Sequence, residues 1–127
     1  MASLVVCVVK EKEGKGGVRL AVDYRYVNRH TIADAYSLPD VANIVQEVGK
    51  ARFISTFDAT KGYYQTAVRE KDRWLTAFTC EFGLFEFTRT LFGMKSSGST
   101  FVRAMQQVLQ PIRKFTASFA DDVSVFF

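Results

Sequence analysis

Short runs of β-branched and aromatic residues recur along the chain, and polar or glycine-containing segments separate them. Such runs occupy residues 4–9, 18–24, 53–57, 115–119 and 123–127. Runs of this length and composition are typical of β-strands. The charged segment with glycines between the first two runs predicts a β-hairpin with a basic tip.

The middle of the chain predicts further strands. Residues 65–68 and 74–79 indicate two strands on either side of a charged segment, and a turn at 82–85 leads into a strand at 85–89. Residues 25–37 are polar and have no clear period, so no regular element is predicted there.

Two segments have the period of a helix. In residues 40–49, apolar side chains recur at i, i+3, i+4 and i+7 between Asp40, a favourable N-cap, and Gly49, a common helix end. A second helix is predicted over residues 100–109, and Pro111 lies beyond its end. Its predicted apolar face comprises Phe101, Met105 and Val108. Strands and hairpins nevertheless dominate, so the predicted fold class is α+β with an antiparallel sheet.

The composition fits one globular domain. A chain of 127 residues suits a modest core, and 12 phenylalanines predict that this core is aromatic. The net charge of +4 is compatible with nucleic-acid binding without being diagnostic of it.

The cysteines and the single histidine restrict the possible chemistry. Cys7 and Cys80 lie singly in apolar runs, which predicts buried free thiols in a reducing compartment and not a metal site or a disulfide framework. His30 is the only histidine, which excludes a multi-His metal site. The run at 4–9 is too short to span a membrane and no signal peptide is present, so a soluble, cytoplasmic or nuclear protein is expected.

Two adjacent carboxylates, Asp121 and Asp122, lie between the last two predicted strands. They would occupy the tip of a tight hairpin, where aspartate is also an ordinary turn residue. Asp58 directly follows the predicted strand 53–57, so the three carboxylates converge if these strands are neighbours in one sheet. Clustered carboxylates repel one another unless a cation neutralises them, and Mg²⁺ prefers carboxylates together with water and phosphate oxygens. A pair of such ions can support phosphoryl transfer, but the spacing alone leaves the ordinary turn open.

A series of motifs runs through nearly the whole chain in one register. Its segments are 19–28 (RLAVDYRYVN), 36–39 (YSLP), 53–65 (FISTFDATKGYYQ), 76–78 (TAF), 82–87 (FGLFEF), 92–95 (FGMK) and 119–122 (FADD). This series resembles the fingers and palm of the reverse transcriptases (RNA-directed DNA polymerases) of gypsy-like LTR retrotransposons. The resemblance implies a palm-type antiparallel sheet with packing helices plus a fingers β-hairpin. Residues 1–127 would then be a single fingers and palm fragment, without the thumb, connection and RNase H domains.

The resemblance also implies roles for individual residues. Asp58, Asp121 and Asp122 match the catalytic carboxylates that bind Mg²⁺, with Mn²⁺ as an alternative. The positions that match nucleotide-binding residues are Lys12 and Arg19 for the triphosphate, Tyr63 for exclusion of a ribose 2′-hydroxyl, and Phe92 and Gly93 beneath the sugar and base. The implied partners are an RNA or DNA template-primer and a dNTP, and the parent element would encode a longer polyprotein.

The expected function is RNA-directed DNA polymerisation by two-metal nucleotidyl transfer to a primer 3′-hydroxyl. Two alternatives remain: a catalytically inactive remnant that at most binds nucleic acid, and a metal-dependent nuclease that uses the same carboxylates. The chain departs from the family pattern at Phe119, where tyrosine is usual, and at Leu91 and Gly98, where proline is common. Glycine at position 98 makes that loop less rigid than proline would.

Overall fold

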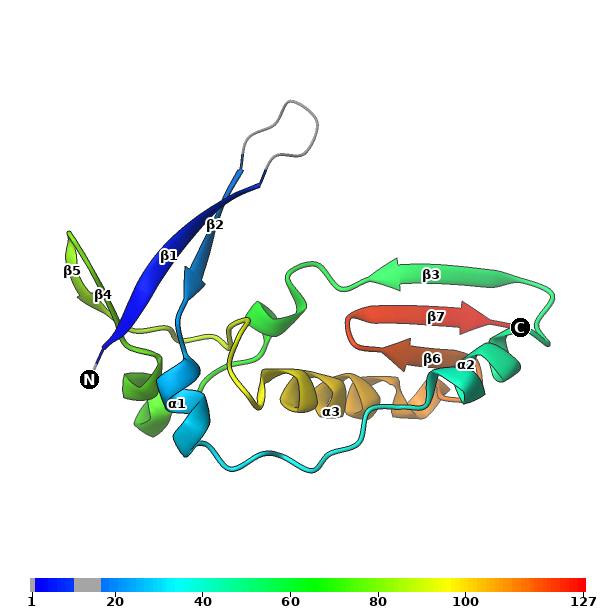
Figure 1. The fold of residues 1–127 in the computed structure, drawn as a ribbon. Helices are drawn as coiled ribbons and strands as arrows, with labels where there is room; N and C mark the ends of the chain where they lie inside the picture. The colour runs from blue at the N-terminus through cyan, green and yellow to red at the C-terminus, as the bar shows by residue number, and fades with distance from the viewer. Residues whose placement is uncertain (1, 11–16) are drawn as a thin grey trace.

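The computed structural model of the chain describes residues 2–10 and 17–127. Within these residues the strands form two separate sheets, and helices lie beside and between them (Figure 1). Most strand pairs are antiparallel, so the predicted α+β class is confirmed. No helix in the described part of the chain is long and apolar enough to cross a membrane.

The first sheet has the strand order β2-β1-β4-β5. Its strands are β1 (Ser3–Lys10), β2 (Gly17–Val22), β4 (Phe78–Cys80) and β5 (Gly83–Phe85). β1 and β2 form the predicted hairpin, which projects from the rest of the molecule in Figure 1. β1 also pairs with β4, in parallel, which joins the hairpin to the middle of the chain. The predicted basic tip, with Lys12, lies outside the described residues.

The second sheet has the order β3-β7-β6 and is antiparallel throughout. Its strands are β3 (Ile54–Asp58), β6 (Thr116–Phe119) and β7 (Asp122–Phe126). β7 is central because its backbone bonds alternately to both sides: Phe126 N–H donates to the Phe115 carbonyl (2.8 Å), and Phe127 N–H donates to the Phe53 carbonyl (3.2 Å). The strands that carry the candidate carboxylates are therefore neighbours, as the catalytic interpretation of the sequence requires.

Two helices, α2 (Val41–Val48) and α3 (Ser97–Leu109), contact β6. α2 begins as predicted, because the Asp40 carboxylate accepts a hydrogen bond from the Ala42 N–H (3.0 Å). α3 begins earlier than predicted, and its first residue donates a hydrogen bond from Ser97 Oγ to the Leu91 carbonyl (2.7 Å). Its predicted face is partly wrong, since Phe101 is buried but Val108 is 72% exposed.

Several sequence predictions in the first half of the chain are wrong. The helix α1 (Arg25–His30) forms where no regular element was expected. The 3₁₀ helix η1 (Gly62–Gln65) includes only the first residue of the strand predicted at 65–68, in which Ala67 forms an isolated β-bridge with Arg89. The 3₁₀ helix η2 (Glu70–Thr76) occupies the first half of the strand predicted at 74–79. Bonds between residues three apart hold these segments, for example from the Asp72 N–H to the Arg69 carbonyl (2.8 Å). A third 3₁₀ helix, η3 (Gln110–Ile112), follows α3.

The buried apolar residues are few and are not mainly phenylalanines, so the predicted aromatic core is wrong. Among the described residues they are Tyr24, Leu91, Phe101, Val102 and Val123. Most other phenylalanines are exposed, such as Phe82 at 81%, whereas Phe78, Phe87 and Phe126 are half-buried. Each sheet is a single layer, and β3 is exposed along its whole length. Cys7 on β1 is exposed and Cys80 is half-buried, so both thiols are free as predicted but Cys7 is not buried.

Candidate active site

Backbone pairing brings the candidate carboxylates to one end of the second sheet. Asp58, the last residue of β3, pairs with Asp122, the first residue of β7. The Ala59 N–H donates a hydrogen bond to the Asp121 carbonyl (2.9 Å), which holds the β6–β7 turn against the end of β3. Ala120 completes this turn in the left-handed conformation, with φ of 52°.

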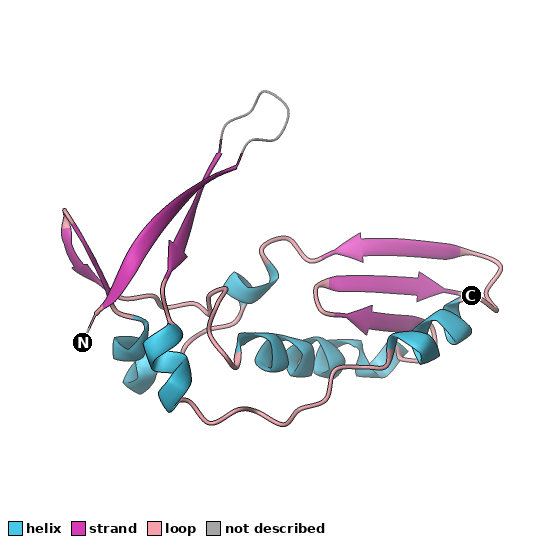
Figure 2. Cartoon of the chain, viewed as in Figure 1, coloured by secondary structure: helices cyan, strands magenta, loops and turns pink. Residues whose placement is uncertain are grey.

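A cavity of about 580 Å³ opens beside this end of the sheet. Asp58 and Asp121 line it from the sheet, and Arg19 of β2 lines it from the hairpin. In Figure 2 the end of β3 and the β6–β7 turn both point toward the side on which the hairpin stands. The remaining lining residues are Gly17, Val18, Leu20, Ala59, Lys61, Gly62, Tyr64 and Phe92. The cavity therefore combines carboxylates that can hold a cation with cations that can pair with phosphate oxygens.

A tight turn leads from β3 into η1 at the floor of this cavity. Lys61 adopts the left-handed conformation, with φ of 51°. Gly62 is buried, and a Cβ atom added there would lie 2.8 Å from the Phe101 ring carbon Cζ. Only glycine fits such a close approach without displacement of its neighbour. The turn places Lys61 and Gly62 in the lining of the cavity that Asp58 and Asp121 also line.

An aromatic wall of the cavity comprises Tyr64 and Phe92, which line it. The Tyr63 and Phe92 rings meet edge to face with centroids 4.7 Å apart, and Tyr64 meets Phe92 at 5.8 Å. Tyr63 also contacts Phe101 of α3 at 5.5 Å. Arg19 completes the wall, because its guanidinium carbon lies 5.2 Å from the centroid of the Phe92 ring.

Asn28 of α1 holds the loop that carries Phe92. Its side-chain amide donates to the Gly93 carbonyl (2.7 Å) and accepts from the Lys95 N–H (2.8 Å). Gly93 has φ of 87°, in the region that favours glycine. No role for Asn28 was predicted, because a lone asparagine in a polar segment carries no signal of a contact so far along the chain.

A sequence comparison with known families identifies the family of this chain. Residues 9–127 match the family described as "Reverse transcriptase (RNA-dependent DNA polymerase)". The chain belongs to the reverse transcriptase family. This match covers nearly the whole chain and confirms the resemblance drawn from the motif series.

Curated relatives of this reverse transcriptase chain are retroelement and viral polyproteins. Over 114 residues it is 39% identical to the Retrovirus-related Pol polyprotein from transposon gypsy of Drosophila melanogaster, and the match covers 89% of this chain and 11% of that protein. Over 115 residues it is 35% identical to the Enzymatic polyprotein of Cauliflower mosaic virus (strain NY8153), covering 91% of this chain and 17% of that protein. The chain therefore spans 11% to 17% of the length of these relatives.

Solved reverse transcriptases share the fold. The foamy viral protease-reverse transcriptase in complex with RNA/DNA hybrid matches 100% of this chain and 16% of its own, with a TM-score of 0.84 and 23% identity. A dRH form in complex with double-stranded DNA matches with a TM-score of 0.86 and 24% identity, over 22% of its chain. The predicted fingers and palm architecture is confirmed, so β1–β2 is hereafter the fingers hairpin and β3-β7-β6 the palm sheet.

The cavity gathers some of the predicted reverse transcriptase site residues but not all of them. Asp58, Asp121, Arg19 and Phe92 line it, whereas Asp122, Tyr63 and Gly93 are not among its lining residues. Tyr63 lies behind Phe92, and Gly93 is the next residue along the loop. The structure also adds Lys61 and Tyr64, which the motif comparison did not single out. Lys12 lies outside the described residues.

The carboxylates suit magnesium by their chemistry. Their oxygen atoms are the ligands that Mg²⁺ prefers, and this ion is commonly held by one or two carboxylates, with water and phosphate oxygens in the remaining positions. Within residues 2–10 and 17–127, no group of three or more Asp, Glu, His or Cys side chains is assembled to hold an ion by itself. Asp58 and Asp121 on one cavity wall fit an ion whose coordination the substrate completes.

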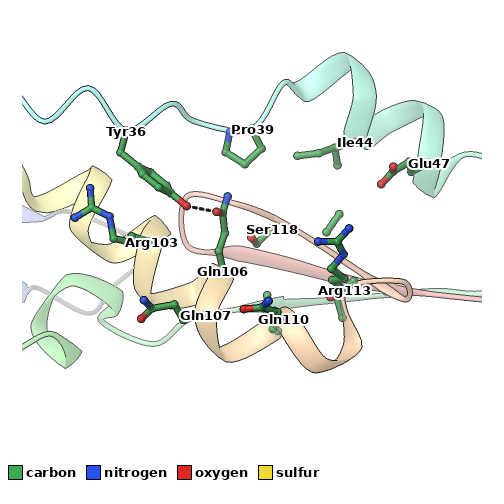
Figure 3. Close-up of a pocket in the computed structure, with 13 residues that line it drawn as sticks. Tyr36, Pro39, Ile44, Glu47, Arg103, Gln106, Gln107, Gln110, Arg113 and Ser118 are labelled. Carbon is green, nitrogen blue, oxygen red and sulfur yellow. Dashed lines mark hydrogen bonds between the residues drawn. The ribbon is translucent and has the colours of Figure 1, made fainter.

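A second cavity, of about 430 Å³, lies between the chain before α2, α2 itself, α3 and β6 (Figure 3). Arg103 of α3 lies over the Tyr36 ring at 4.7 Å and pairs with Asp34 (2.7 Å). The Tyr36 hydroxyl donates a hydrogen bond to Gln106. These contacts attach the connection before α2 to α3, and none of the predicted site residues lines this cavity.

Proposed function

We propose that this chain is the fingers and palm portion of an RNA-directed DNA polymerase, which transfers a nucleotide from a dNTP to a primer 3′-hydroxyl. The observation that carries this proposal is the shared cavity, which Asp58 and Asp121 line at one end of the palm sheet together with Arg19 of the fingers hairpin. Membership of the reverse transcriptase family supports the same assignment. The proposed partners are a nucleic-acid template-primer and a dNTP, within a longer polyprotein.

The reaction forms a bond between the primer 3′-oxygen and the α-phosphorus of the nucleotide. The bond from that phosphorus to the pyrophosphate breaks, and the 3′-hydroxyl loses its proton. Asp58, Asp121 and Asp122 would hold Mg²⁺, which supplies positive charge for the phosphate oxygens and the attacking hydroxyl. Arg19 would pair with the triphosphate, since a guanidinium offers several N–H donors in a planar fork. The catalytic contribution of the chain is therefore positioning and charge neutralisation.

Primer extension on an RNA template with Mg²⁺ or Mn²⁺ tests this function. We expect extension by the chain alone to be inefficient and Asp121→Asn to abolish it. Asp72→Asn is a matched control, because Asp72 does not line the cavity and forms a salt bridge with Arg69 (2.9 Å). Extension that survives Asp121→Asn would contradict the assignment of the carboxylates.

One alternative is a piece that binds nucleic acid without catalysis, for which Arg19 and Lys61 of the cavity would supply the cations. Salt-sensitive binding of an RNA/DNA duplex without extension would support it, because phosphate contacts make affinity fall with salt. Cleavage of the duplex without synthesis would instead support the nuclease.

Selection against ribonucleotides provides a sharper prediction about two adjacent tyrosines. Tyr63 is the proposed gate for the 2′-hydroxyl, but Tyr64 is the one that lines the cavity. We expect Tyr63→Val to reduce the preference for dTTP over UTP by at least about tenfold, because loss of a steric clash is worth about 1–3 kcal/mol. Tyr64→Val is the matched control, and the measurement is the ratio of kcat/KM for the two nucleotides. A larger effect of Tyr64→Val would move the gate to that residue.

A further inference from the structure

The Phe92 ring is the point at which the fingers hairpin and the palm meet in the nucleotide cavity. Arg19, from the hairpin, places its guanidinium carbon 5.2 Å from the ring centroid. From the palm, Tyr63 meets the ring at 4.7 Å with an interplanar angle of 90°, and Tyr64 meets it at 5.8 Å with an angle of 66°. One ring therefore packs against two tyrosines while it contacts a cation from the other sheet.

Groups that are more deeply buried than Phe92 hold its ring in place. Tyr63, which packs on Phe92, also packs on Phe101 at 5.5 Å, and Phe101 is only 4% exposed. The backbone next to Phe92 is fixed by the hydrogen bond from the Asn28 amide to the Gly93 carbonyl (2.7 Å). Phe92 thus has a defined position although 41% of it is exposed to solvent.

The contact with Phe92 leaves the hydrogen-bond donors of Arg19 free. A guanidinium bound over an aromatic face is attracted by the electrons of the ring, whereas its N–H donors radiate in its own plane. A carboxylate partner would occupy those donors, but a ring does not. An exposed arginine also has considerable rotamer freedom, and restricting that freedom before a ligand arrives reduces the entropic cost of binding.

We propose that Phe92 is a positioning residue, whose ring holds the Arg19 guanidinium over the cavity with its donors available to the triphosphate. This inference rests on the proposed function, in which Arg19 pairs with the triphosphate. It assigns to Phe92 an action through Arg19, beyond any contact of the ring with the sugar or base. Triphosphate affinity then depends on the face of the ring at position 92.

Calorimetric titration of the full chain with Mg²⁺-tripolyphosphate tests this coupling, because that probe has no sugar or base. We expect Phe92→Leu to weaken binding about fivefold, the size of a partly exposed cation–π contact. Phe92→Tyr, which keeps the ring, should bind like the wild type. In an Arg19→Gln background, Phe92→Leu should cause no further loss, as a double-mutant cycle requires of two residues that act together. Phe82→Leu, at a residue 81% exposed and outside the cavity, is the matched control.

An NMR measurement examines the contact without any ligand. The Arg19 side-chain signals should show a ring-current shift that Phe92→Leu removes and Phe92→Tyr preserves. The absence of this shift in the wild type would overturn the inference. It would also be overturned if Phe92→Leu left tripolyphosphate affinity unchanged, or weakened it equally in the Arg19→Gln background. If the wild type bound neither tripolyphosphate nor dTTP, that result would instead contradict the proposed function itself.

Discussion

At the scale of single residues, two strained backbone positions flank the candidate carboxylates. Lys61 and Ala120 have φ angles of 51° and 52°, a region that non-glycine residues rarely adopt. Each costs about 1–2 kcal/mol relative to the right-handed conformation. The Ala59–Asp121 backbone hydrogen bond joins the two segments that contain these positions and helps to maintain them.

Ala120→Gly should therefore stabilise the protein. Glycine removes the steric cost of the left-handed conformation, and its greater freedom in the unfolded chain offsets part of that gain. We expect the free energy of unfolding to rise by about 0.5–1 kcal/mol in urea denaturation. The control is Ala117→Gly in β6, where the backbone is an ordinary strand, and that change should lower stability by about the same amount. A loss of stability in both variants would contradict the argument.

Tyr24 gives a second prediction at this scale. Its ring is 2% exposed and its hydroxyl donates to the Thr76 carbonyl (3.1 Å). Burial raises the pKa of Tyr24 above its ordinary value of 10.0, because the phenolate is poorly solvated. The unfolded chain therefore loses this proton at lower pH than the folded protein, so stability is intact below pH 10 and falls as the pH rises further.

Urea denaturation between pH 8 and pH 11 measures this effect. We expect the free energy of unfolding to decline above pH 10 in the wild type and to decline less in Tyr24→Phe. The variant should also be less stable at pH 8, by about 1 kcal/mol, because the Thr76 carbonyl loses its donor. Tyr26→Phe, at a residue 53% exposed, is the control that should leave the alkaline decline unchanged.

At the scale of elements, α3 begins with residues that favour helices poorly. Its first turn reads Ser97-Gly98-Ser99-Thr100, yet it starts earlier than its apolar period predicts. Tertiary contacts account for this start, because the buried Ser97 hydroxyl bonds to the Leu91 carbonyl. Local sequence is overruled here by a hydrogen bond to a loop that precedes the helix.

Gly98→Ala should stabilise α3. A Cβ atom at this position would lie 3.8 Å from the Tyr63 hydroxyl, an ordinary contact distance. The gain should be about 0.5–1 kcal/mol, from higher helix propensity and lower freedom of the unfolded chain. Thermal or urea unfolding measures it. Gly49→Ala is the contrasting variant and should lose stability, because its Cβ would lie 2.9 Å from the Val45 carbonyl oxygen.

The elements also show what the sequence could predict. α2 was predictable because Asp40 supplies a local cap and the apolar period is regular. α1 was not, because its N-cap residue Tyr24 makes no side-chain cap bond and the helix has no apolar stripe. The 3₁₀ helix η2 was predicted to be part of a strand. In a short segment, the three-residue period of a 3₁₀ helix cannot be distinguished from the two-residue alternation of a strand.

The candidate site was predictable in part for a similar reason. Asp58 and Asp121 are found from sequence because they lie at the ends of apolar strand-like runs, and the pairing of β3 with β7 brings these ends together. The roles of Asn28 and Lys61 depend on side-chain reach and on a left-handed backbone, neither of which leaves a pattern in neighbouring residues. Burial was the least predictable property, because it depends on which faces of the two sheets other elements cover.

At the scale of the whole molecule, the two sheets share no strand among the described residues, and the loop 92–95 is one of the bridges between them. Arg19 contacts this loop at Phe92, and Asn28 bonds to it at Gly93 and Lys95. The loop leads directly into α3, which contacts the palm sheet. These side-chain contacts with the loop therefore help to fix the relative position of fingers and palm.

Asn28→Ala should weaken this junction. It removes two hydrogen bonds from the loop, and we expect a loss of about 1–2 kcal/mol in the free energy of unfolding. Hydrogen exchange should accelerate at the amide of Lys95, which loses its acceptor. Asn43→Ala, on an exposed position of α2, is the matched control and should not accelerate exchange in the loop. Unchanged protection of Lys95 in Asn28→Ala would show that other contacts hold the junction.

The pairing of Asp58 with Asp122 has a consequence for how activity is distributed among molecules. Strand register changes only in whole residues, and a slip of one residue shifts a strand by about 3.3 Å and turns its side chains to the opposite face. No intermediate arrangement of the carboxylates is therefore accessible through the backbone. A preparation in which some molecules mispair β3 would contain fully competent and fully inert molecules, with none of intermediate rate. Its specific activity would be proportional to the fraction of correctly paired molecules, and the turnover rate of each active molecule would stay constant.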